Sequence, residues 1–430
     1  RSETLFALYD EEENTLVGVS GEAAHYGLIV DIGTTTVAAL MLDLDTRRVV
    51  ASRGEHNAEA PFGADVISRI QQSMEQGVAP LQQAIVRQID ELCASLCTEC
   101  GCTDVSLISI TGNTTMLHLL CGLPATNISR APFIPVTTEA MRCNAASLGL
   151  HSQATTFLLP GISAYIGADT VASLLAAAGH TTGERPFLLV DFGTNAETVL
   201  FANGTYYACS AAAGPCFEGA TLACGMAGQH GAIDTVLARP ATPGASHAGF
   251  AVTVIGGGTA RGVCGSGVVD AIALLLDSGD LDETGRLEGS LTTEDESGTR
   301  FQLTDKVYLS QKDIREVQLA KAAVRAGIEV LLTEAGLLAN DVQTLFLAGG
   351  FGSAIRPESA VRIGLVPEEL KHRVQVLGNA ACFGALRAVT ETAATVLTST
   401  ILRTTRYIEL SAHPGFCDTY VENMLFPQGA

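Results

Sequence analysis

The hydrophobic pattern of this chain repeats one arrangement twice. Residues 28–32 form an apolar run interrupted by Asp31, and residues 188–192 form a matching run interrupted by Asp191. In both copies a glycine and small polar residues follow, and a second apolar run then leads away. Apolar runs separated by a short glycine turn predict β-hairpins. We therefore expect two hairpins, each with a carboxylate at its mouth.

The turns of these hairpins have the residues that a phosphate group requires. Gly33 lets the backbone approach a ligand closely, while the turn N–H groups and the hydroxyls of Thr34 and Thr35 can donate to phosphate oxygens. The second copy offers the corresponding residues Gly193, Thr194 and Asn195.

An aspartate beside bound phosphates would repel them unless a cation lay between. We therefore interpret Asp31 and Asp191 as residues that face a hydrated Mg²⁺ ion, with two related lobes gripping one nucleotide. The alternative is an ordinary Asp/Gly hairpin turn, which is common in strand-rich proteins. Because the motif occurs twice with the same flanking pattern, we favour the nucleotide site.

A third element supports this interpretation. Residues 345–348 predict a buried strand that ends in Gly349, Gly350 and Phe351, where bare backbone can pack against an adenine or a ribose. With this turn, the hairpins resemble the actin, sugar kinase and heat-shock ATPase superfamily. The resemblance implies an α/β fold with two ribonuclease H-like lobes around a central nucleotide cleft, the actin-like ATPase fold, with ATP as ligand.

The expected division of the chain follows from the position of the two hairpins. Residues 1–24 are expected to be a linker or the end of a preceding module, and residues 25–184 the first lobe. Residues 185–384 are expected to form the second lobe. Residues 385–430 would add a C-terminal helix and strand that return across the lobes. The first residue is Arg rather than Met, which indicates a fragment of a longer protein.

Length and composition agree with two lobes. The 430 residues exceed the roughly 250–300 that one hydrophobic core serves, and 47% of them are apolar. A net charge of −21 argues against binding nucleic acid or an anionic membrane through bulk electrostatics. Neither a membrane-spanning run nor a signal peptide is visible, so a cytoplasmic location is expected.

Several other segments are expected to be regular. Helices are predicted over residues 79–97 and 314–338, a strand over 105–111, and an exposed acidic excursion over 281–303. Glycine-rich loops that open helices can hold phosphate or ribose. Gly257 and Gly258, which precede a helix predicted from Val268, are weak candidates of this kind.

Two further sets of polar residues have two interpretations each. Asp169 comes just before a predicted helix over 171–178, where an acidic cap is commonplace, and we favour that interpretation. The alternative is that Asp169 positions the water that attacks the γ-phosphate. In the superfamily a helix matching 314–338 flanks the nucleotide base, so Lys321 and Arg325 are candidates there, against a merely solvated face.

Four of the twelve cysteines lie close together in the sequence. Their spacing fits neither the usual zinc motifs nor the usual ferredoxin motifs, so buried or incidental thiols are favoured over a metal cluster. These residues are Cys93, Cys97, Cys100 and Cys102.

A closer resemblance extends from Tyr26 to the C-terminus. The segments 112–116, 168–172, 212–219 and 262–267 together look like the reductive activators of corrinoid proteins. The resemblance implies ATP-dependent return of corrinoid cobalt from Co(II) to Co(I), with a corrinoid protein and an electron donor as partners, and a homodimer. That family also carries an iron–sulfur cluster on a ferredoxin-like domain absent from this chain, which was either removed or is replaced by another chain.

This resemblance leads to a hypothesis about partner contact. The small-residue loop around Ser210 is expected to reach the corrin, with the Ser210 hydroxyl as a weak oxygen contact. Two alternatives remain: a small-molecule kinase of the same fold, and a nucleotide-gated binding module with little turnover. The sequence shows no separate substrate signature for a kinase.

Overall fold

The computed structural model describes residues 6–10, 15–20, 25–181, 183, 185–239, 249–295 and 298–428. The chain divides into two compact units, one of residues 1–182 with 379–407 and one of residues 183–378 with 408–430. The segment expected as one piece from residue 385 is therefore shared between the units. The predicted linker 1–24 lies largely outside the described residues, apart from the paired strands β1 (Phe6–Asp10) and β2 (Thr15–Ser20).

The first unit is built on a six-stranded sheet in the order β5-β4-β3-β6-β8-β7. Strands β3, β4 and β5 pair as antiparallel hairpins. Strand β6 runs parallel to β3, and β8 runs parallel to β6. The predicted hairpin at Asp31 is confirmed. The strands are β3 (Tyr26–Ile32), β4 (Thr36–Asp43), β5 (Arg48–His56), β6 (Leu107–Gly112), β7 (Met141–Asn144) and β8 (Thr155–Leu158).

Helices cover both faces of β3, which is why its sequence is almost continuously apolar. Leu28 and Val30 share one core cluster with the apolar face of helix α2. Side chains alternate between faces, so Asp31 lies on the other face, where Ser109 of β6 donates to the Ala385 carbonyl of helix α9 at 3.0 Å. Asp31 is therefore on the face of the sheet that α9 covers.

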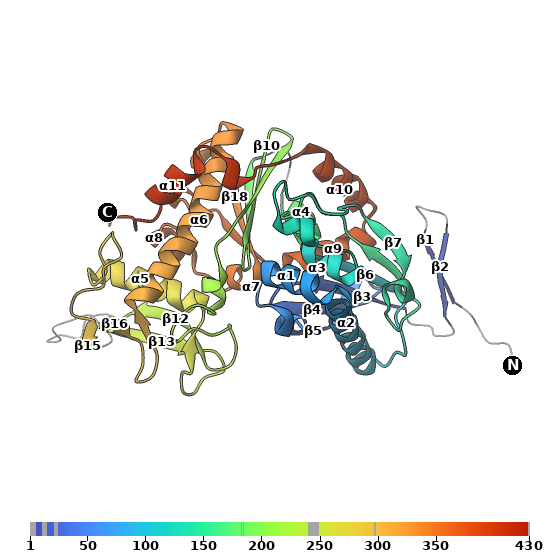
Figure 1. The fold of residues 1–430 in the computed structure, drawn as a ribbon, viewed down its shortest axis with the longest axis horizontal. Helices are drawn as coiled ribbons and strands as arrows, with labels where there is room; N and C mark the ends of the chain where they lie inside the picture. The colour runs from blue at the N-terminus through green and yellow to red at the C-terminus, as the bar shows by residue number, and fades with distance from the viewer. Residues whose placement is uncertain are drawn as a thin grey trace. The chain divides into compact units, whose positions relative to one another are not determined.

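The helices of the first unit begin at recognisable signals. Asp65 and Ser68 form a capping box at the start of α1, and Asn113 caps α3 by accepting from the Met116 N–H. The long helix α2 lies against β4 and β5 (Figure 1). The helices are α1 (Val66–Gln76), α2 (Ala79–Cys100), α3 (Thr114–Leu120), α4 (Ala168–Ala178), α9 (Ala380–Thr390) and α10 (Thr392–Thr404), with the short strand β20 (Thr405–Tyr407) after α10.

The second unit repeats the strand arrangement of the first. Its strands follow one another in the order β19-β18-β9-β10-β11, with β9, β10 and β11 antiparallel and β18 and β19 added in parallel. The predicted hairpin at Asp191 is also confirmed. The strands are β9 (Phe187–Phe192), β10 (Ala196–Ala202), β11 (Thr205–Ala211), β18 (Thr344–Ala348) and β19 (Val374–Gly378).

The described residues of the second unit also form two smaller sheets and five α-helices, and α11 lies beside α6 (Figure 1). The smaller sheets are β13-β12-β14 and β15-β16-β17. Their strands are β12 (Ala232–Ala238), β13 (Phe250–Val254), β14 (Gly262–Val263), β15 (Thr292–Asp295), β16 (Gly298–Gln302) and β17 (Tyr308–Ser310). The helices are α5 (Gly265–Ser278), α6 (Gln311–Ala335), α7 (Gly349–Gly352), α8 (Pro357–Arg362) and α11 (Phe416–Glu422).

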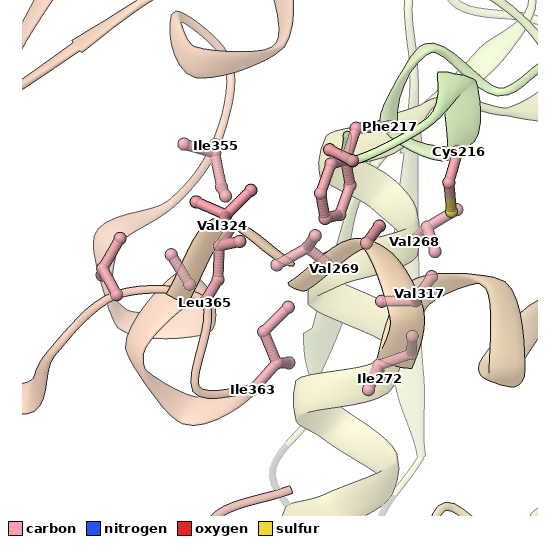
Figure 2. Packing of buried hydrophobic residues seen from close by; sticks show 14 of the residues in the cluster. Cys216, Phe217, Val268, Val269, Ile272, Val317, Val324, Ile355, Ile363 and Leu365 are labelled. Carbon is pink, nitrogen blue, oxygen red and sulfur yellow. The ribbon is translucent and has the colours of Figure 1, made fainter. Parts of the chain in front are cut away.

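The core of the second unit packs α5 against α6. Residues 281–303 were expected to be exposed, and this is wrong in part, because Leu281, Leu287 and Phe301 are buried in the same core. The segment was predicted to be exposed because most of its residues are polar or acidic and its apolar residues are few. Figure 2 shows Val268, Val269 and Ile272 of α5 gathered with Val317 and Val324 of α6 and with Phe217.

The sequence analysis expected neither a membrane-spanning segment nor a metal cluster at the four neighbouring cysteines. Within the described residues, no single helix has both the length and the apolar content to cross a membrane. None of the twelve cysteines, all of which lie in the described part of the chain, forms a disulfide, and no three Cys, His, Asp or Glu side chains of the described residues are grouped to hold a metal. Cys93 and Cys97 are buried at the end of α2, where hydrogen bonding with Cys93 and burial raise the pKa of the Cys97 thiol.

Candidate phosphate-binding hairpins

The turn of the first hairpin is closed by a hydrogen bond from the Gly33 N–H to the Thr36 carbonyl at 3.1 Å. A Cβ atom on Gly33 would lie 2.6 Å from that carbonyl oxygen, so no larger residue fits. Gly112, which ends β6, is equally confined, because its Cβ would lie 2.8 Å from the Ile32 carbonyl oxygen. Gly33 therefore lets its own hairpin turn close tightly, and Gly112 lets the backbones of β6 and β3 meet closely at Ile32.

Two side chains that the sequence analysis did not identify, Asn57 and Arg69, bind the carbonyl groups of this turn. Asn57 donates from Nδ2 to the Gly33 carbonyl at 2.7 Å, and Arg69 donates from Nη2 to the Thr34 carbonyl at 2.6 Å. Arg69 is 1% exposed and pairs with the fully buried Glu59 at 3.3 Å. The one signal for this role in the sequence is an arginine directly before Ile70, which is also buried in helix α1.

Asp31 has a hydroxyl and a thiol as neighbours. Thr111 is its partner in the parallel β3–β6 register, and the Thr111 hydroxyl is fully buried with no hydrogen-bond partner among the described residues. Burial raises the pKa of the Cys382 thiol, near the start of α9, and the charge of Asp31 adds to this effect. An unsatisfied buried hydroxyl beside a carboxylate fits a site completed by a bound oxygen-rich group.

Asp169 lies near this hairpin, but not as a helix cap. The cap of α4 is Gly167, and Asp169 is in the first turn, where its Oδ1 accepts from the Thr170 N–H at 2.7 Å. A Cβ on Gly167 would lie 2.6 Å from the Cα of Asn113 and 2.8 Å from Oδ1 of Asp169. Because Asn113 donates to the Thr34 hydroxyl at 3.1 Å, the structure brings α4 and the first hairpin together.

The second hairpin has a different set of neighbours. The Thr194 hydroxyl donates to Oε2 of Glu218 at 3.0 Å, and the turn is closed by the Gly193 N–H and the Asn195 carbonyl at 2.8 Å. Asp191 lies opposite Glu197 in the antiparallel register of β9 and β10. The second hairpin therefore has the carboxylates of Glu197 and Glu218 as neighbours, whereas the first has the guanidinium of Arg69.

The predicted glycine turn after β18 packs against the second hairpin. Gly349 has a φ of 81°, and a Cβ on it would lie 2.2 Å from the Phe192 carbonyl oxygen and 2.9 Å from Oδ1 of Asp191. A Cβ on Gly350 would have no atom of the described residues within 4 Å. The Phe351 ring is buried and stacks on Phe217 at 4.6 Å, so it belongs to the core.

The prediction for Lys321 requires correction, whereas that for Arg325 stays a prediction. Lys321 is 1% exposed, and its Nζ donates to the carbonyls of Asn423 and Leu425 at 2.7 and 2.5 Å. Burial lowers the pKa of Lys321 to about 7. Arg325 pairs with Glu329 at 2.7 Å on the same helix. Lys321 therefore holds the C-terminal segment and lies neither on a solvated face nor free for a nucleotide base.

Two other predicted contacts also lie in different surroundings from those expected. Gly257 and Gly258 are exposed in the loop between β13 and β14, so they do not open helix α5, which begins at Gly265. Ser210 is in strand β11 rather than in a loop, and its hydroxyl donates to Oε1 of Glu197 at 3.1 Å. The run of small residues allowed close strand packing, which the sequence could not distinguish from a loop.

The repeated sheet order, with an aspartate hairpin and a following glycine turn in each unit, defines an actin-like ATPase fold. The model of a family domain described as the C-terminal domain of RACo, the ASKHA domain, matches residues 185–430. A second model, described as the RACo middle region, matches residues 26–182. The chain belongs to the RACo family.

Its relatives agree with this assignment. The chain is 31% identical over 426 residues to the corrinoid activation enzyme RamQ of Eubacterium limosum, covering 93% of this chain and 70% of that protein. It is 25% identical over 392 residues to a Co(II) methylated amine-specific corrinoid protein reductase of Methanosarcina barkeri, covering 85% and 70%. A solved reductive activator for corrinoid,iron-sulfur protein superposes with a TM-score of 0.85 at 30% identity, covering 96% and 68%.

Proposed function

We propose that this chain is an ATP-dependent reductive activator, which helps return the cobalt of a corrinoid methyltransferase protein from Co(II) to Co(I). The observation that carries the proposal is membership of the RACo family over residues 26–182 and 185–430. The names of the relatives supply the substrate class, and the two aspartate hairpins supply the means of binding ATP.

The described residues fit a magnesium nucleotide. Asp31 and Asp191 offer the hard carboxylate oxygens that Mg²⁺ prefers, and the unsatisfied Thr111 hydroxyl beside Asp31 adds a further polar group. Bound Mg²⁺ would neutralise charge on the phosphates. The N–H groups of residues 33–35 and 193–195 would bind phosphate oxygens, and the backbone of Gly349 and Gly350 would pack against the adenosine.

In this proposal Asp169 orients the attacking water molecule. Its carboxylate is in the first turn of α4, which packs on Asn113, and Asn113 in turn bonds Thr34 of the phosphate turn. A carboxylate at this place would orient the water that attacks the γ-phosphate. In this proposal Asp169 serves catalysis in addition to its local bond to Thr170.

ATP is needed because the electron transfer is energetically uphill. For a one-electron step each 59 mV of mismatch in potential costs about 1.4 kcal/mol, so a few hundred millivolts require several kcal/mol. The activator can supply this if it binds the corrinoid protein best in an easily reduced geometry and ATP turnover then releases that protein. Ser210 stays our candidate for a weak oxygen contact to the corrin.

The test measures ATP hydrolysis with and without a purified corrinoid protein whose cobalt is Co(II), with a low-potential chemical reductant present. Hydrolysis stimulated by the corrinoid protein, together with the absorbance change of Co(I), is the expected result. A phosphorylated small molecule would instead identify a kinase. Tight ATP binding without hydrolysis, whether or not the corrinoid protein is added, would identify a binding module.

Variants of single site residues test the role that the proposal gives to each residue. Asp31→Asn and Asp169→Asn should each lower stimulated hydrolysis about a hundredfold or more, because they remove the metal ligand and the water-orienting carboxylate. Asp45→Asn is the matched control, since Asp45 is exposed in the same unit. Ser210→Ala should slow cobalt reduction while leaving ATP binding intact, and an unchanged reduction rate would remove Ser210 from the proposal.

A further inference from the structure

Three consecutive carbonyls of the first hairpin turn are each held by a donor from outside the turn. The Gly33 carbonyl accepts from Asn57 Nδ2 at 2.7 Å, and the Thr34 carbonyl accepts from Arg69 Nη2 at 2.6 Å. The Thr35 carbonyl accepts from the Asn57 N–H at 2.9 Å and lies 2.7 Å from Nδ1 of His56. The carbonyl side of the turn is thus bonded to the protein along its length.

This bonding fixes the direction of the opposite side of the turn. In a trans peptide the carbonyl of one residue and the N–H of the next point in opposite directions. When the Gly33 and Thr34 carbonyls point toward Asn57 and Arg69, the N–H groups of Thr34 and Thr35 must point away from them. Successive N–H groups aimed to one side form the kind of concavity that binds phosphate oxygens.

The donors themselves are held rigidly. Oδ1 of Asn57 accepts from the Glu59 N–H at 2.8 Å, which fixes the amide so that Nδ2 faces Gly33. Arg69 also donates from Nε to the Gly63 carbonyl at 3.0 Å. Asn57, Glu59 and Arg69 are 2%, 0% and 1% exposed. Gln88 of α2 bonds both the His56 carbonyl and the Ala58 N–H, so the segment that carries Asn57 is anchored as well.

A buried ion pair is a poor way to stabilise a fold, because desolvation of the two charges offsets their attraction and apolar residues of similar volume do as well. The Glu59–Arg69 pair nevertheless lies directly behind the turn, with Arg69 reaching a turn carbonyl. Such a pair is explained better by the direction that it imposes on the turn than by its contribution to stability.

We propose that Asn57 and Arg69, the latter held by Glu59, are positioning residues that aim the N–H groups of Thr34 and Thr35 at the phosphates of ATP. This inference rests on the proposed function. It adds three residues that touch neither the nucleotide nor the metal, and whose effect reaches ATP only through the backbone of the turn.

The experiment measures MgATP binding by calorimetry, together with the rise in melting temperature that MgATP causes, for the full chain and its variants. Asn57→Asp keeps the size of the side chain but replaces the donor to Gly33 by an acceptor, and Arg69→Met removes the donor to Thr34. Each should weaken MgATP binding about tenfold, equivalent to the loss of one hydrogen bond to the turn. The KM for ATP should rise more than the rate at saturating ATP falls.

The controls separate this inference from a merely structural role. Arg53→Met removes an exposed arginine that pairs with Glu99 in the same unit and should leave MgATP binding unchanged. Arg69→Lys restores one donor and should recover part of the affinity. If Arg69→Met does not fold, Asn57→Asp decides the matter.

The possible outcomes distinguish the inference from the proposed function. If the wild-type chain does not bind MgATP, the proposed function fails. If the wild type binds MgATP and folded Asn57→Asp binds it equally well, the positioning role is overturned while the proposed function stands. Weakened binding in Asn57→Asp with unchanged binding in Arg53→Met supports the positioning role.

Discussion

The two hairpins occupy the same place in two sheets of the same topology, yet they are stabilised by different means. In the first, Ile32 pairs with Val37, whereas in the second Phe192 pairs with Ala196, so the second turn is one residue shorter. A buried arginine and an asparagine hold the first turn through its carbonyls.

The second hairpin rests instead on an aromatic cluster. The Phe192 ring meets the rings of Phe351 and Phe217 edge to face at 5.1 and 6.3 Å, and those two rings stack on each other. The difference teaches that topology fixes where a phosphate-binding turn lies, while local packing decides what keeps it rigid. Four predictions test this contrast, from the largest expected effect to the smallest.

The largest effect is expected for Gly349→Ala beside the second hairpin. The new Cβ would lie 2.2 Å from the Phe192 carbonyl oxygen, in a residue with a φ of 81°. Strain and overlap together should lower the free energy of unfolding by about 4 kcal/mol. Chemical denaturation measures this, with Gly350→Ala as control because its Cβ meets no atom within 4 Å in the part of the chain that the structure describes. Equal stability of the two variants would contradict the close packing described.

The first hairpin should make stability depend on pH through Glu59. Burial raises the pKa of Glu59 from 4.5 to about 7. Between these values the folded chain keeps a proton that the unfolded chain loses, so the free energy of unfolding falls as pH rises. In Glu59→Gln this decline should be absent, a difference of up to about 3 kcal/mol. Denaturation curves from pH 4.5 to 8 measure it, and parallel pH profiles would refute it.

The turn glycines should tolerate substitution unequally. A Cβ on Gly33 would lie 2.6 Å from the Thr36 carbonyl oxygen, whereas on Gly193 the nearest atom would be the Asn195 carbonyl oxygen at 3.5 Å, an ordinary contact. We expect Gly33→Ala to destabilise by about 2 kcal/mol and Gly193→Ala by less than about 1 kcal/mol. Thermal denaturation of both variants measures the difference. A larger loss for Gly193→Ala would reverse the comparison.

The smallest effect concerns the polar link of the second hairpin. Thr194→Val removes the hydroxyl that donates to Glu218 at 3.0 Å and should cost about 1 kcal/mol of stability. A double-mutant cycle with Glu218→Ala, which removes the acceptor, isolates the pair, because its coupling energy should account for most of that cost. Strictly additive losses would show that the two side chains do not interact.

Much of the fold could be predicted from local patterns. Both hairpins, the strand before Gly112 and helix α2 were expected, because apolar periodicity and turn glycines act over a few residues. The positions of Asp31 and Asp191 at the hairpin mouths followed from the same patterns. Segment 281–303 was misjudged, since its few apolar residues enter a core that is formed by distant helices.

The surroundings of the site could not be read in this way. Lys321 looked like a cation on a helix face, and only the C-terminal segment that covers it shows what it binds. Ser210 looked like a loop residue, and only its pairing in β11 next to Glu197 shows otherwise. In each case the partner comes from a distant or separate strand or segment.

The sequence by itself therefore determined the two aspartate hairpins, the glycine turn at Gly349 and the class of protein, because each is encoded within a short run of residues. Only the tertiary structure decided that Asn57, Glu59 and Arg69 lie behind the first turn and that Phe351 joins the core. Side chains far apart along the chain become neighbours only when sheets and helices pack, and burial then sets their hydrogen bonds and charges.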